Sequence, residues 1–235
     1  MEKQTLRERV WDELDESGDA RFPFPPHGRI PNFAGAAEAA EKLSSLAVWE
    51  DVETVKANPD SPQRPVRQRA LEAGKTVYMA VPRLRDEKCF LELDPAEIDD
   101  YDRATTISGS SELGVQVGPD DVDEVDLVVS GSVAVGTDGE RVGKGEGYSD
   151  LEYAVLSGLG LVDDATTVVS TVHEIQVRDE DIAVDAHDVP MDVVVTPERV
   201  VETETPFDRP DGIDWDALGD RVEEMPVLER LRTDP

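Results

Sequence analysis

Apolar residues recur along this chain at two spacings, one typical of helices and one typical of buried strands. Near the start, Leu6, Val10 and Leu14 recur every four positions, which places them on one face of a helix expected over residues 2–15. Three later stretches have a helical composition and spacing, and the last two end in glycine, as helices often do; they are residues 35–46, 66–74 and 151–160.

Short apolar runs that predict strands alternate with these helices. The runs are rich in valine and bounded by turn residues, and they lie at residues 52–58, 75–82, 165–172 and 191–197 and within 122–135. Strand and helix in alternation require crossover connections between parallel strands. The sequence therefore predicts an α/β fold, namely a three-layer α/β/α sandwich with a largely parallel sheet.

Two segments depart from this alternation. Residues 21–33 are rich in proline and are expected to be irregular, because proline removes an N–H donor and restricts the residue before it. Residues 201–235 form an acidic C-terminal extension to a domain expected over residues 1–200. The extension is expected to pack on the domain, because it carries apolar side chains at Ile213, Trp215, Leu218, Met225, Leu228 and Leu231.

The net charge of the chain indicates the kind of solvent in which it folds. Its 235 residues include 54 Asp and Glu but only 23 Lys and Arg, a formal net charge of −31. Such charge repels itself in a compact state unless salt screens it, as when the Debye length falls to about 3 Å in 1 M salt. We therefore expect a cytoplasmic protein of a salt-loaded halophile. Nucleic-acid binding is not expected, because it needs a basic surface.

Membrane attachment and disulfide chemistry are also not expected. The amino terminus lacks the apolar core of a signal peptide, and no apolar run approaches the length of a spanning helix. The one cysteine, Cys89, has no internal partner, which fits a reducing interior. Cys89 is interpreted as a half-buried small side chain.

Candidate chemistry is concentrated in the stretch GERVGKGEGYSD at residues 139–150. It follows an apolar strand and a turn, and it precedes a helix expected to begin at about Leu151. This is where α/β proteins bind anions, with backbone N–H groups at the start of a helix. Gly143, Gly145 and Gly147 allow positive φ and a close approach of the backbone to a ligand. The other interpretation is a glycine-rich surface turn, because neither common phosphate motif matches and Tyr148 stands where a third glycine would be needed.

The scarcity of cations favours the phosphate-binding interpretation. Arg141 and Lys144 lie within the glycine-rich stretch, where they would neutralise phosphate oxygens, and Asp150 would hold a magnesium ion directly or through water. Lys3 and Arg7 are four residues apart and share one face of the first helix. Their alternative role is local pairing with neighbouring glutamates of the same helix.

Several motifs in order resemble those of the 5-formyltetrahydrofolate cyclo-ligases, also called methenyltetrahydrofolate synthetases. They are KxxLR at Lys3–Arg7, RVGKGEGYSD in the middle of the chain and AHDVPMDVVVTP at Ala186–Pro197. The stretches GRIPNFAGA, KANPDSPQRPVR, VPRLR and GKGEGYSDLEYA look like the divergent branch of methenyltetrahydrofolate synthetase domain-containing proteins. The resemblance covers roughly residues 1–200.

The resemblance implies an ATP-dependent ligase of one-carbon metabolism with a three-layer α/β fold. Such an enzyme uses MgATP to phosphorylate the formyl oxygen of 5-formyltetrahydrofolate, and closure to 5,10-methenyltetrahydrofolate releases ADP and phosphate. It implies Arg141 and Lys144 as catalytic residues, Tyr148 at the border of the ATP site and Asp150 as the magnesium residue. The residues implied to contact the ATP phosphates are Lys3, Arg7, Arg141, Gly143, Lys144, Gly145 and Gly147.

Some positions depart from the family pattern. Ser149 replaces the second tyrosine of the usual loop, Leu151 replaces a basic residue, and Pro62 stands where a folate-site glutamate is expected. Either Asp60 or Gln63 has taken over that role, or the substrate is not 5-formyltetrahydrofolate.

Three functions therefore remain open. The first is the cyclo-ligase, and the second is a nucleotide-binding regulatory or interaction protein that has lost folate turnover. The third is the same phosphoryl chemistry on another carboxylate or formamide. The pair His187–Asp188 is interpreted as a structural corner rather than a catalytic dyad, and we expect a monomer or homodimer.

Overall fold

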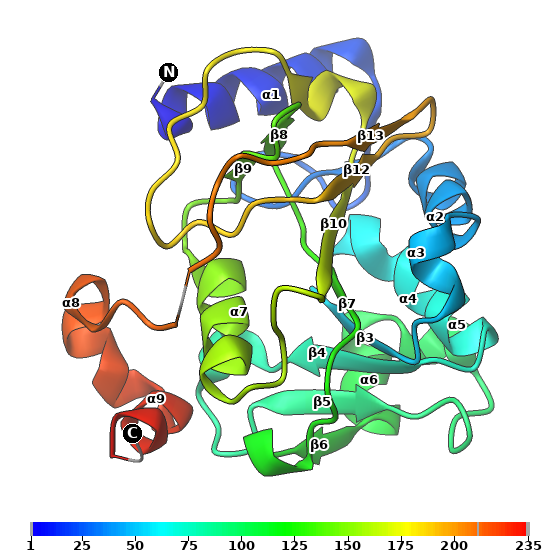
Figure 1. The fold of residues 1–235 in the computed structure, drawn as a ribbon. Helices are drawn as coiled ribbons and strands as arrows, with labels where there is room; N and C mark the ends of the chain where they lie inside the picture. The colour runs from blue at the N-terminus through cyan, green and yellow to red at the C-terminus, as the bar shows by residue number, and fades with distance from the viewer. Residues whose placement is uncertain (1, 211, 234–235) are drawn as a thin grey trace.

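A mixed sheet of eight strands forms the centre of the protein (Figure 1). The computed structural model describes residues 2–210 and 212–233. The strand order is β13-β12-β10-β7-β3-β4-β5-β6. Five central strands are mutually parallel: β3 (Thr54–Ala57), β4 (Thr76–Ala80), β7 (Leu127–Val129), β10 (Thr167–Thr171) and β12 (Val193–Val195).

The antiparallel strands lie at the two edges of this sheet. They are β5 (Phe90–Leu93) and β6 (Val115–Val117) at one edge and β13 (Val200–Glu202) at the other. The predicted α/β class with a largely parallel sheet is therefore confirmed, and all of the strands expected from apolar runs are present.

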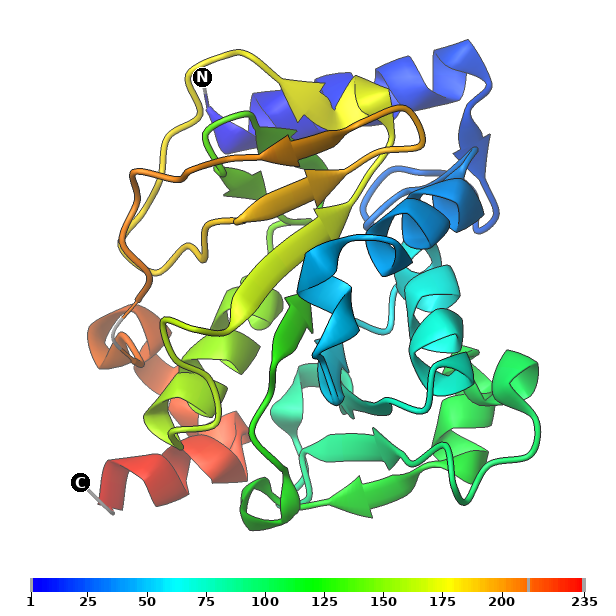
Figure 2. The same cartoon turned by 45° about the vertical axis from the view of Figure 1, so that its right-hand side comes forward.

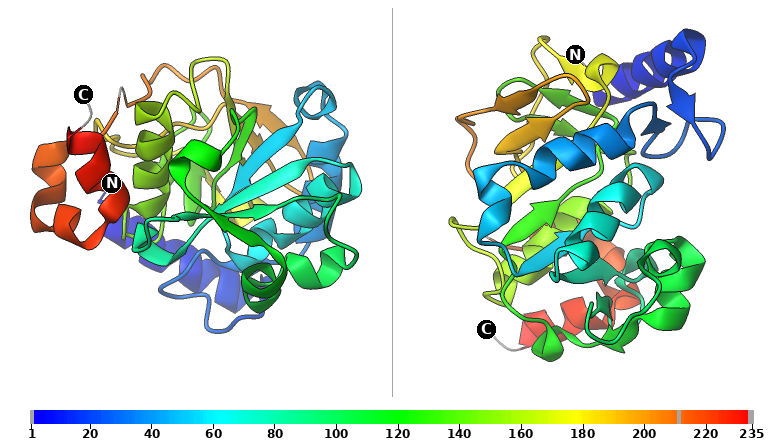
Figure 3. Two further views of the ribbon diagram at one scale, coloured as in Figure 1. Left: turned by 90° about the horizontal axis from the view of Figure 1, so that it is seen from below. Right: turned by 90° about the vertical axis from the view of Figure 1, so that its right-hand side faces the viewer.

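Helices cover both faces of the sheet (Figures 2 and 3). Along β7, Leu127 and Val129 belong to one buried cluster and Val128 to the other, as the alternation of side chains in a strand requires. The first cluster includes residues of α2 (Ala36–Ser44) and α4 (Arg64–Glu72). The second includes residues of α7 (Tyr148–Gly158), which therefore lies on the opposite face.

The first helix lies over a second, smaller sheet. In α1 (Lys3–Ser17), Leu6, Val10 and Leu14 are fully buried, which confirms the helix predicted from their spacing. Figure 1 shows α1 along β8 and β9. The small sheet has the order β11-β8-β9 and consists of β8 (Ala134–Gly136), β9 (Arg141–Val142) and β11 (Val177–Arg178). The apolar run within 122–135 thus forms two strands, β7 and β8, in different sheets.

Several elements were not predicted from the sequence. Within the proline-rich passage, β1 (Ala20–Arg21) and β2 (Asn32–Phe33) pair as a short antiparallel ladder, and the peptide bonds before Pro23 and Pro25 are cis. The strands β5, β6, β9, β11 and β13 were not predicted either. Neither were these short helices and turns: α3 (Ala47–Glu50), α5 (Tyr101–Ala104), α6 (Ile107–Leu113), η1 (Ser61–Gln63), η2 (Pro82–Leu84), η3 (Pro119–Asp121) and η4 (Glu174–Gln176).

The C-terminal segment packs beside α7 (Figure 3). It contains α8 (Trp215–Leu218), η5 (Gly219–Glu224) and α9 (Pro226–Thr233). Met225 and Leu228 are buried in the same cluster as the apolar residues of α7. Cys89 is fully buried rather than half-buried, and burial raises the pKa of its thiol to about 12. Among the described helices, none has the length and apolar composition to cross a membrane.

The order of the strands creates a site at the carboxyl edge of the sheet. From β3 the chain passes through α4 to β4, whereas from the adjacent β7 it passes through α7 to β10 on the other side. Because α4 and α7 lie on opposite faces, the connections that follow β3 and β7 leave the carboxyl ends of these strands in opposite directions. Open α/β sheets bind ligands at such a switch point.

Candidate functional site

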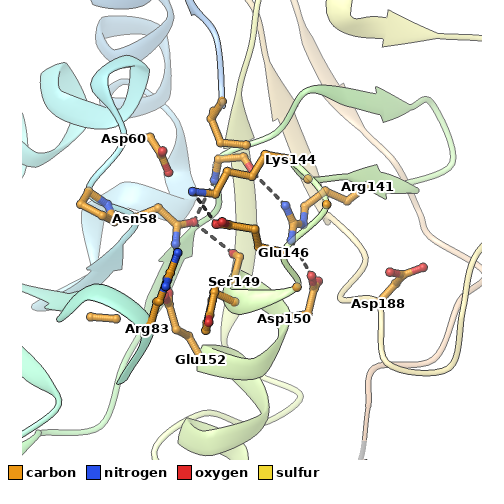
Figure 4. A pocket seen from close by; sticks show the side chains of 18 of the residues that line it. Asn58, Asp60, Arg83, Arg141, Lys144, Glu146, Ser149, Asp150, Glu152 and Asp188 are labelled. Atoms are coloured by element: carbon orange, nitrogen blue, oxygen red, sulfur yellow. Dashed lines mark hydrogen bonds and ion pairs between the residues drawn. The ribbon is translucent and has the colours of Figure 1, made fainter. Parts of the chain in front are cut away.

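A cleft of about 450 Å³ opens at this switch point (Figure 4). Residues that follow β3, β4 and β7 line it, together with the loop between β9 and α7. The structure brings all of the predicted site residues to this one cleft: Lys3, Arg7, Arg141, Gly143, Lys144, Gly145, Gly147, Tyr148 and Asp150.

The glycine-rich loop leads directly into a helix. Gly145 has φ +107° and Gly147 has φ +70°, conformations that residues with a Cβ rarely adopt. The left-handed turn at Gly147 starts α7 at Tyr148, earlier than the expected position near Leu151. The first backbone N–H groups of a helix have no partner within it, so this end of α7 attracts anions.

Arg141 connects two segments of the cleft through hydrogen bonds of its buried guanidinium. The residue is 5% exposed. Its Nη1 donates to the carbonyl oxygen of Gly131 at 2.7 Å, and its Nη2 donates to Oδ2 of Asp150 at 2.7 Å. Gly143 lies so close that a Cβ there would be 3.0 Å from Nη1 of Arg141. The guanidinium therefore joins the end of β7 to the first turn of α7, and a side chain at 143 would press on it.

Two cations of α1 reach the same loop and the segment beside it. Nε of Arg7 donates to the carbonyl oxygen of Gly143 at 2.7 Å. Burial, and next the charge of Arg141, lower the pKa of Arg7. Nζ of Lys3 lies 2.7 Å from Oδ2 of Asp185 and 2.5 Å from Oδ2 of Asp188. Its ion pairs thus join distant parts of the chain rather than neighbouring glutamates of the helix.

The pKa of Lys3 reflects opposing effects. Burial lowers this pKa, but hydrogen bonds and charges of Asp185 and Asp188 outweigh it, so the pKa stands above the ordinary value. The result is an ammonium group fixed at the edge of the cleft. Its two carboxylate partners offset its charge, so its main effect is to join α1 to the segment that contains Asp185 and Asp188.

Lys144 and several carboxylates also line the cleft near the glycine-rich loop. Nζ of Lys144 lies 2.8 Å from Oε2 of Glu146, and the lysine side chain is 38% exposed, so it is open to solvent. Asp150 uses both oxygens, because Oδ1 also accepts from the backbone N–H of Val189 at 3.1 Å. A separate trio offers ligand atoms within 4.8 Å of one another, a spacing that suits a metal ion: Asp185, His187 and Asp188.

The floor of the cleft holds a buried charged network that the sequence analysis missed. Nζ of Lys56 lies 2.5 Å from Oε2 of Glu152, with side-chain exposures of 1% and 8%. Nδ2 of Asn58 donates to the same carboxylate oxygen at 3.0 Å, and its Oδ1 accepts from Oγ of Ser149 at 3.1 Å. The only signal in the sequence is a lysine within an apolar strand. Ser149, which departs from the family pattern, is thus part of this network.

The positions near Pro62 differ in their relation to the cleft. Asp60 lines it, and burial is the main cause that raises the pKa of its carboxyl group. Gln63 is fully buried, and neither polar atom of its amide has a partner among the described residues. Neither Gln63 nor Pro62 belongs to the cleft lining. Of the two substitutes considered for the missing glutamate, Asp60 is the one that faces the cleft.

Fold and cleft together define an α/β protein with a cleft at the switch point of its sheet, lined by a glycine-rich loop and the start of a helix. The chain belongs to the 5-formyltetrahydrofolate cyclo-ligase family, whose sequence profile matches residues 1–197. The family expected from the motifs is therefore confirmed.

Two relatives cover nearly all of this chain. The methenyltetrahydrofolate synthase domain-containing protein of Mus musculus is 43% identical over 237 residues, covering 99% of this chain and 63% of the mouse protein. Its counterpart of Homo sapiens is 39% identical, covering 99% of this chain and 62% of the human protein. The chain thus spans less than two thirds of the length of these relatives.

A solved structure shares the fold. The 5,10-methenyltetrahydrofolate synthetase of Aquifex aeolicus superposes with a TM-score of 0.56 at 21% identity, covering 88% of this chain and 96% of that one. This likeness agrees with the layered architecture described above.

Proposed function

We propose that this chain is an ATP-dependent 5-formyltetrahydrofolate cyclo-ligase-like enzyme of one-carbon metabolism. It converts 5-formyltetrahydrofolate and MgATP to 5,10-methenyltetrahydrofolate, ADP and phosphate. The proposal includes a cytoplasmic location, a small-molecule substrate rather than a nucleic acid, and a monomer or homodimer.

One observation carries the proposal: a single cleft at the switch point holds carboxylates together with groups that suit phosphates (Figure 4). The phosphate half of the cleft, meaning the glycine-rich loop, the start of α7 and the cations of α1, suits phosphates. The carboxylates of Asp60 and Glu152 in the same cleft suit the N–H groups of a second substrate. A transfer between two bound substrates needs this arrangement, because the reacting groups must be held in contact.

The chemistry proposed here depends on positioning and charge. The formyl oxygen attacks the terminal phosphorus of ATP, and the bond from that phosphorus to the ADP oxygen breaks. The second folate nitrogen then attacks the activated carbon and releases its proton to solvent, and the bond from that carbon to the phosphorylated oxygen breaks, so that phosphate leaves with the oxygen. Cations near the loop stabilise the charge on the transferred phosphoryl group.

The proposed roles follow from the contacts of each residue. Lys144, exposed on the loop, contacts the phosphates, and Arg7 acts beside it. Arg141 acts mainly through the loop, because its guanidinium is held by Gly131 and Asp150. Asp150 would supply a carboxylate oxygen to the magnesium of MgATP, directly or through water. The trio that includes Asp188 offers further oxygen and nitrogen ligands.

A second candidate is a nucleotide-binding regulatory protein without folate turnover. It is favoured by Pro62, which occupies the position of the expected glutamate and does not line the cleft. The phosphate half would then bind a nucleotide without transferring a phosphoryl group to an acceptor. The same phosphoryl chemistry on another carboxylate or formamide is a third candidate that Pro62 also allows.

A spectroscopic assay tests the proposal. The purified chain in about 2–3 M KCl, where salt screens its charge, is mixed with MgATP and 5-formyltetrahydrofolate. We expect the absorbance of methenyltetrahydrofolate to grow, to require ATP and to disappear in Lys144→Ala. ATP binding by calorimetry without any product would support the second candidate instead. Unchanged ATP binding in Arg141→Ala combined with Lys144→Ala would contradict the role of the loop.

A further inference from the structure

One cation of the cleft stands apart from the phosphate half. Arg83 lines the cleft from η2, the turn that follows β4. Figure 4 shows its side chain rising beside Asn58, on the side away from Asp188. Within the described ranges 2–210 and 212–233, the Arg83 side chain has no ion pair or hydrogen bond. In a chain with 54 acidic residues, an arginine that lines a cleft and has no carboxylate partner is available to a ligand.

The backbone at Arg83 adopts an unfavourable conformation. Arg83 has φ 62° and Leu84 has φ 52°, both in the left-handed region that residues with a Cβ rarely adopt. The side chain of Leu84 is fully buried, and its N–H donates to the carbonyl oxygen of Val81 at 3.1 Å. These contacts hold the turn and present Arg83 to the cleft. Such strained positions concentrate at functional sites.

The surroundings of Arg83 indicate the chemistry of its ligand. The phosphates of ATP already have Lys144 and the cations of α1 in the same cleft. A guanidinium binds a planar carboxylate through two parallel hydrogen bonds. Asp60 and Glu152 line the cleft with Arg83 and would repel an anion placed next to them. An acceptor that satisfies all three has its N–H groups toward the carboxylates and its own carboxylate at Arg83.

We propose that Arg83 binds a carboxylate of the acceptor substrate and thereby fixes which end of the acceptor faces the phosphoryl donor. This inference rests on the proposed function. For 5-formyltetrahydrofolate, the carboxylates are those of the glutamate tail. The pteridine N–H groups then face Asp60 and Glu152, and the formyl group faces the glycine-rich loop.

Calorimetry with two forms of one ligand tests this role. Wild-type protein, Arg83→Asn and Arg85→Gln are titrated with 5-formyltetrahydrofolate and with its dimethyl ester, in the same buffer. Asparagine tolerates the left-handed conformation, so the turn is expected to persist in Arg83→Asn. Arg85 is the matched control, because it lies on the same turn but pairs with Glu224 at 3.6 Å and does not line the cleft.

The expected result is a preference for the free acid that depends on Arg83. Wild-type protein and Arg85→Gln should bind the acid about ten- to hundredfold more tightly than the ester. Arg83→Asn should bind the two forms equally, with unchanged ATP affinity. Equal binding of both forms by wild-type protein would overturn the inference, as would a preference that persists in Arg83→Asn. A loss of ATP affinity in Arg83→Asn alone would assign Arg83 to the phosphates and also overturn it.

Product formation in the same samples separates this inference from the proposed function. An acid preference that depends on Arg83, without ATP-dependent methenyltetrahydrofolate, would leave the inference standing and contradict the cyclo-ligase. Product formation without any preference for the free acid would support the cyclo-ligase and contradict the role of Arg83.

Discussion

Arg7 and Gly143 are joined by a hydrogen bond of 2.7 Å, although 136 residues separate them in the chain. The donor is Nε of the guanidinium, and the acceptor is a carbonyl oxygen of the glycine-rich loop. A Cβ at Gly145 would lie 3.5 Å from Cζ of Arg7, so the same guanidinium lies against two positions of the loop. The first helix therefore takes part in shaping the phosphate half of the cleft.

Removal of this contact should weaken nucleotide binding. Arg7→Leu keeps the aliphatic bulk but loses the charge and the bond to Gly143. We expect ATP affinity to fall about ten- to hundredfold, as for the loss of a hydrogen bond to a charged group. Calorimetry with Arg9→Gln provides the control, because Arg9 is on the same helix but pairs with Glu180. Equal ATP affinity in Arg7→Leu and Arg9→Gln would refute this role.

Arg141 and Lys144 should differ in what they stabilise. Arg141→Met leaves Asp150 as an unpaired carboxylate with a side-chain exposure of 12%, so we expect a loss of about 3–5 kcal/mol in the free energy of unfolding. Lys144→Ala removes a side chain that is 38% exposed, and its effect should stay within about 0.5 kcal/mol. Urea unfolding measures both. Similar free energies of unfolding of the two variants would show that the contacts of Arg141 do not stabilise the fold.

The buried pair of Lys56 and Glu152 should show strong coupling. Lys56→Met or Glu152→Gln alone leaves one charge buried without its partner, which should cost about 3–5 kcal/mol of unfolding free energy. The double variant removes both charges and should recover most of that loss. A double-mutant cycle in urea measures the coupling. Additive losses would contradict it.

Asp60 should make stability depend on pH in a defined direction. Burial raises the pKa of this carboxyl above its ordinary value of 3.8, so the folded state holds the proton more tightly than the unfolded state. Its contribution therefore favours folding at low pH and is lost as the pH rises from about the ordinary value through the raised one.

The variant Asp60→Asn tests this sign. It should be more stable than the wild type at neutral pH, and the difference should shrink as the pH falls toward the ordinary pKa. Urea unfolding at several pH values measures the difference. A constant difference across the range, or one that grows on acidification, would contradict the assignment.

Salt should control folding of the whole chain. With a net charge of −31, self-repulsion is screened only at high ionic strength. We expect circular dichroism to show a folded protein in about 3 M KCl and loss of helix signal in about 0.1 M KCl. A fully folded spectrum at low salt would remove the halophilic interpretation.

The elements predicted from the sequence are those that bury a regular apolar pattern. The spacing of Leu6, Val10 and Leu14 and the valine-rich runs of β7, β10 and β12 identified the centre of the fold. The edge strands β5 and β6 were missed because they are short and alternate less clearly. In α6, Gly109 and three serines give little helical signal, and the helix is held by packing and by the Thr106 side chain, which accepts from the N–H of Gly109.

The sequence predicted where the site lies, but it predicted few of the contacts between the side chains of the site. Scarce cations and glycines identified the loop, and all of those residues line the cleft. The orientation of Arg141 toward Gly131 and Asp150 depends on segments that only the fold brings together. Lys56 and Glu152 are 96 residues apart, so neither residue alone indicated the pair. Arg83 lies in the stretch VPRLR that carries part of the family resemblance, but its left-handed backbone is visible only in three dimensions.

The bond between Arg7 and Gly143 also fixes when a growing chain acquires its phosphate site. Arg7 leaves the ribosome early, but its acceptor is synthesised 136 residues later. At about 5–20 residues per second, this delay is roughly 7–27 s. During that interval α1 has neither the loop nor the carboxylates of residues 185–188 to contact. A nucleotide bound as proposed therefore cannot assist the early steps of folding during translation, and it would stabilise only a chain whose synthesis has passed Asp188.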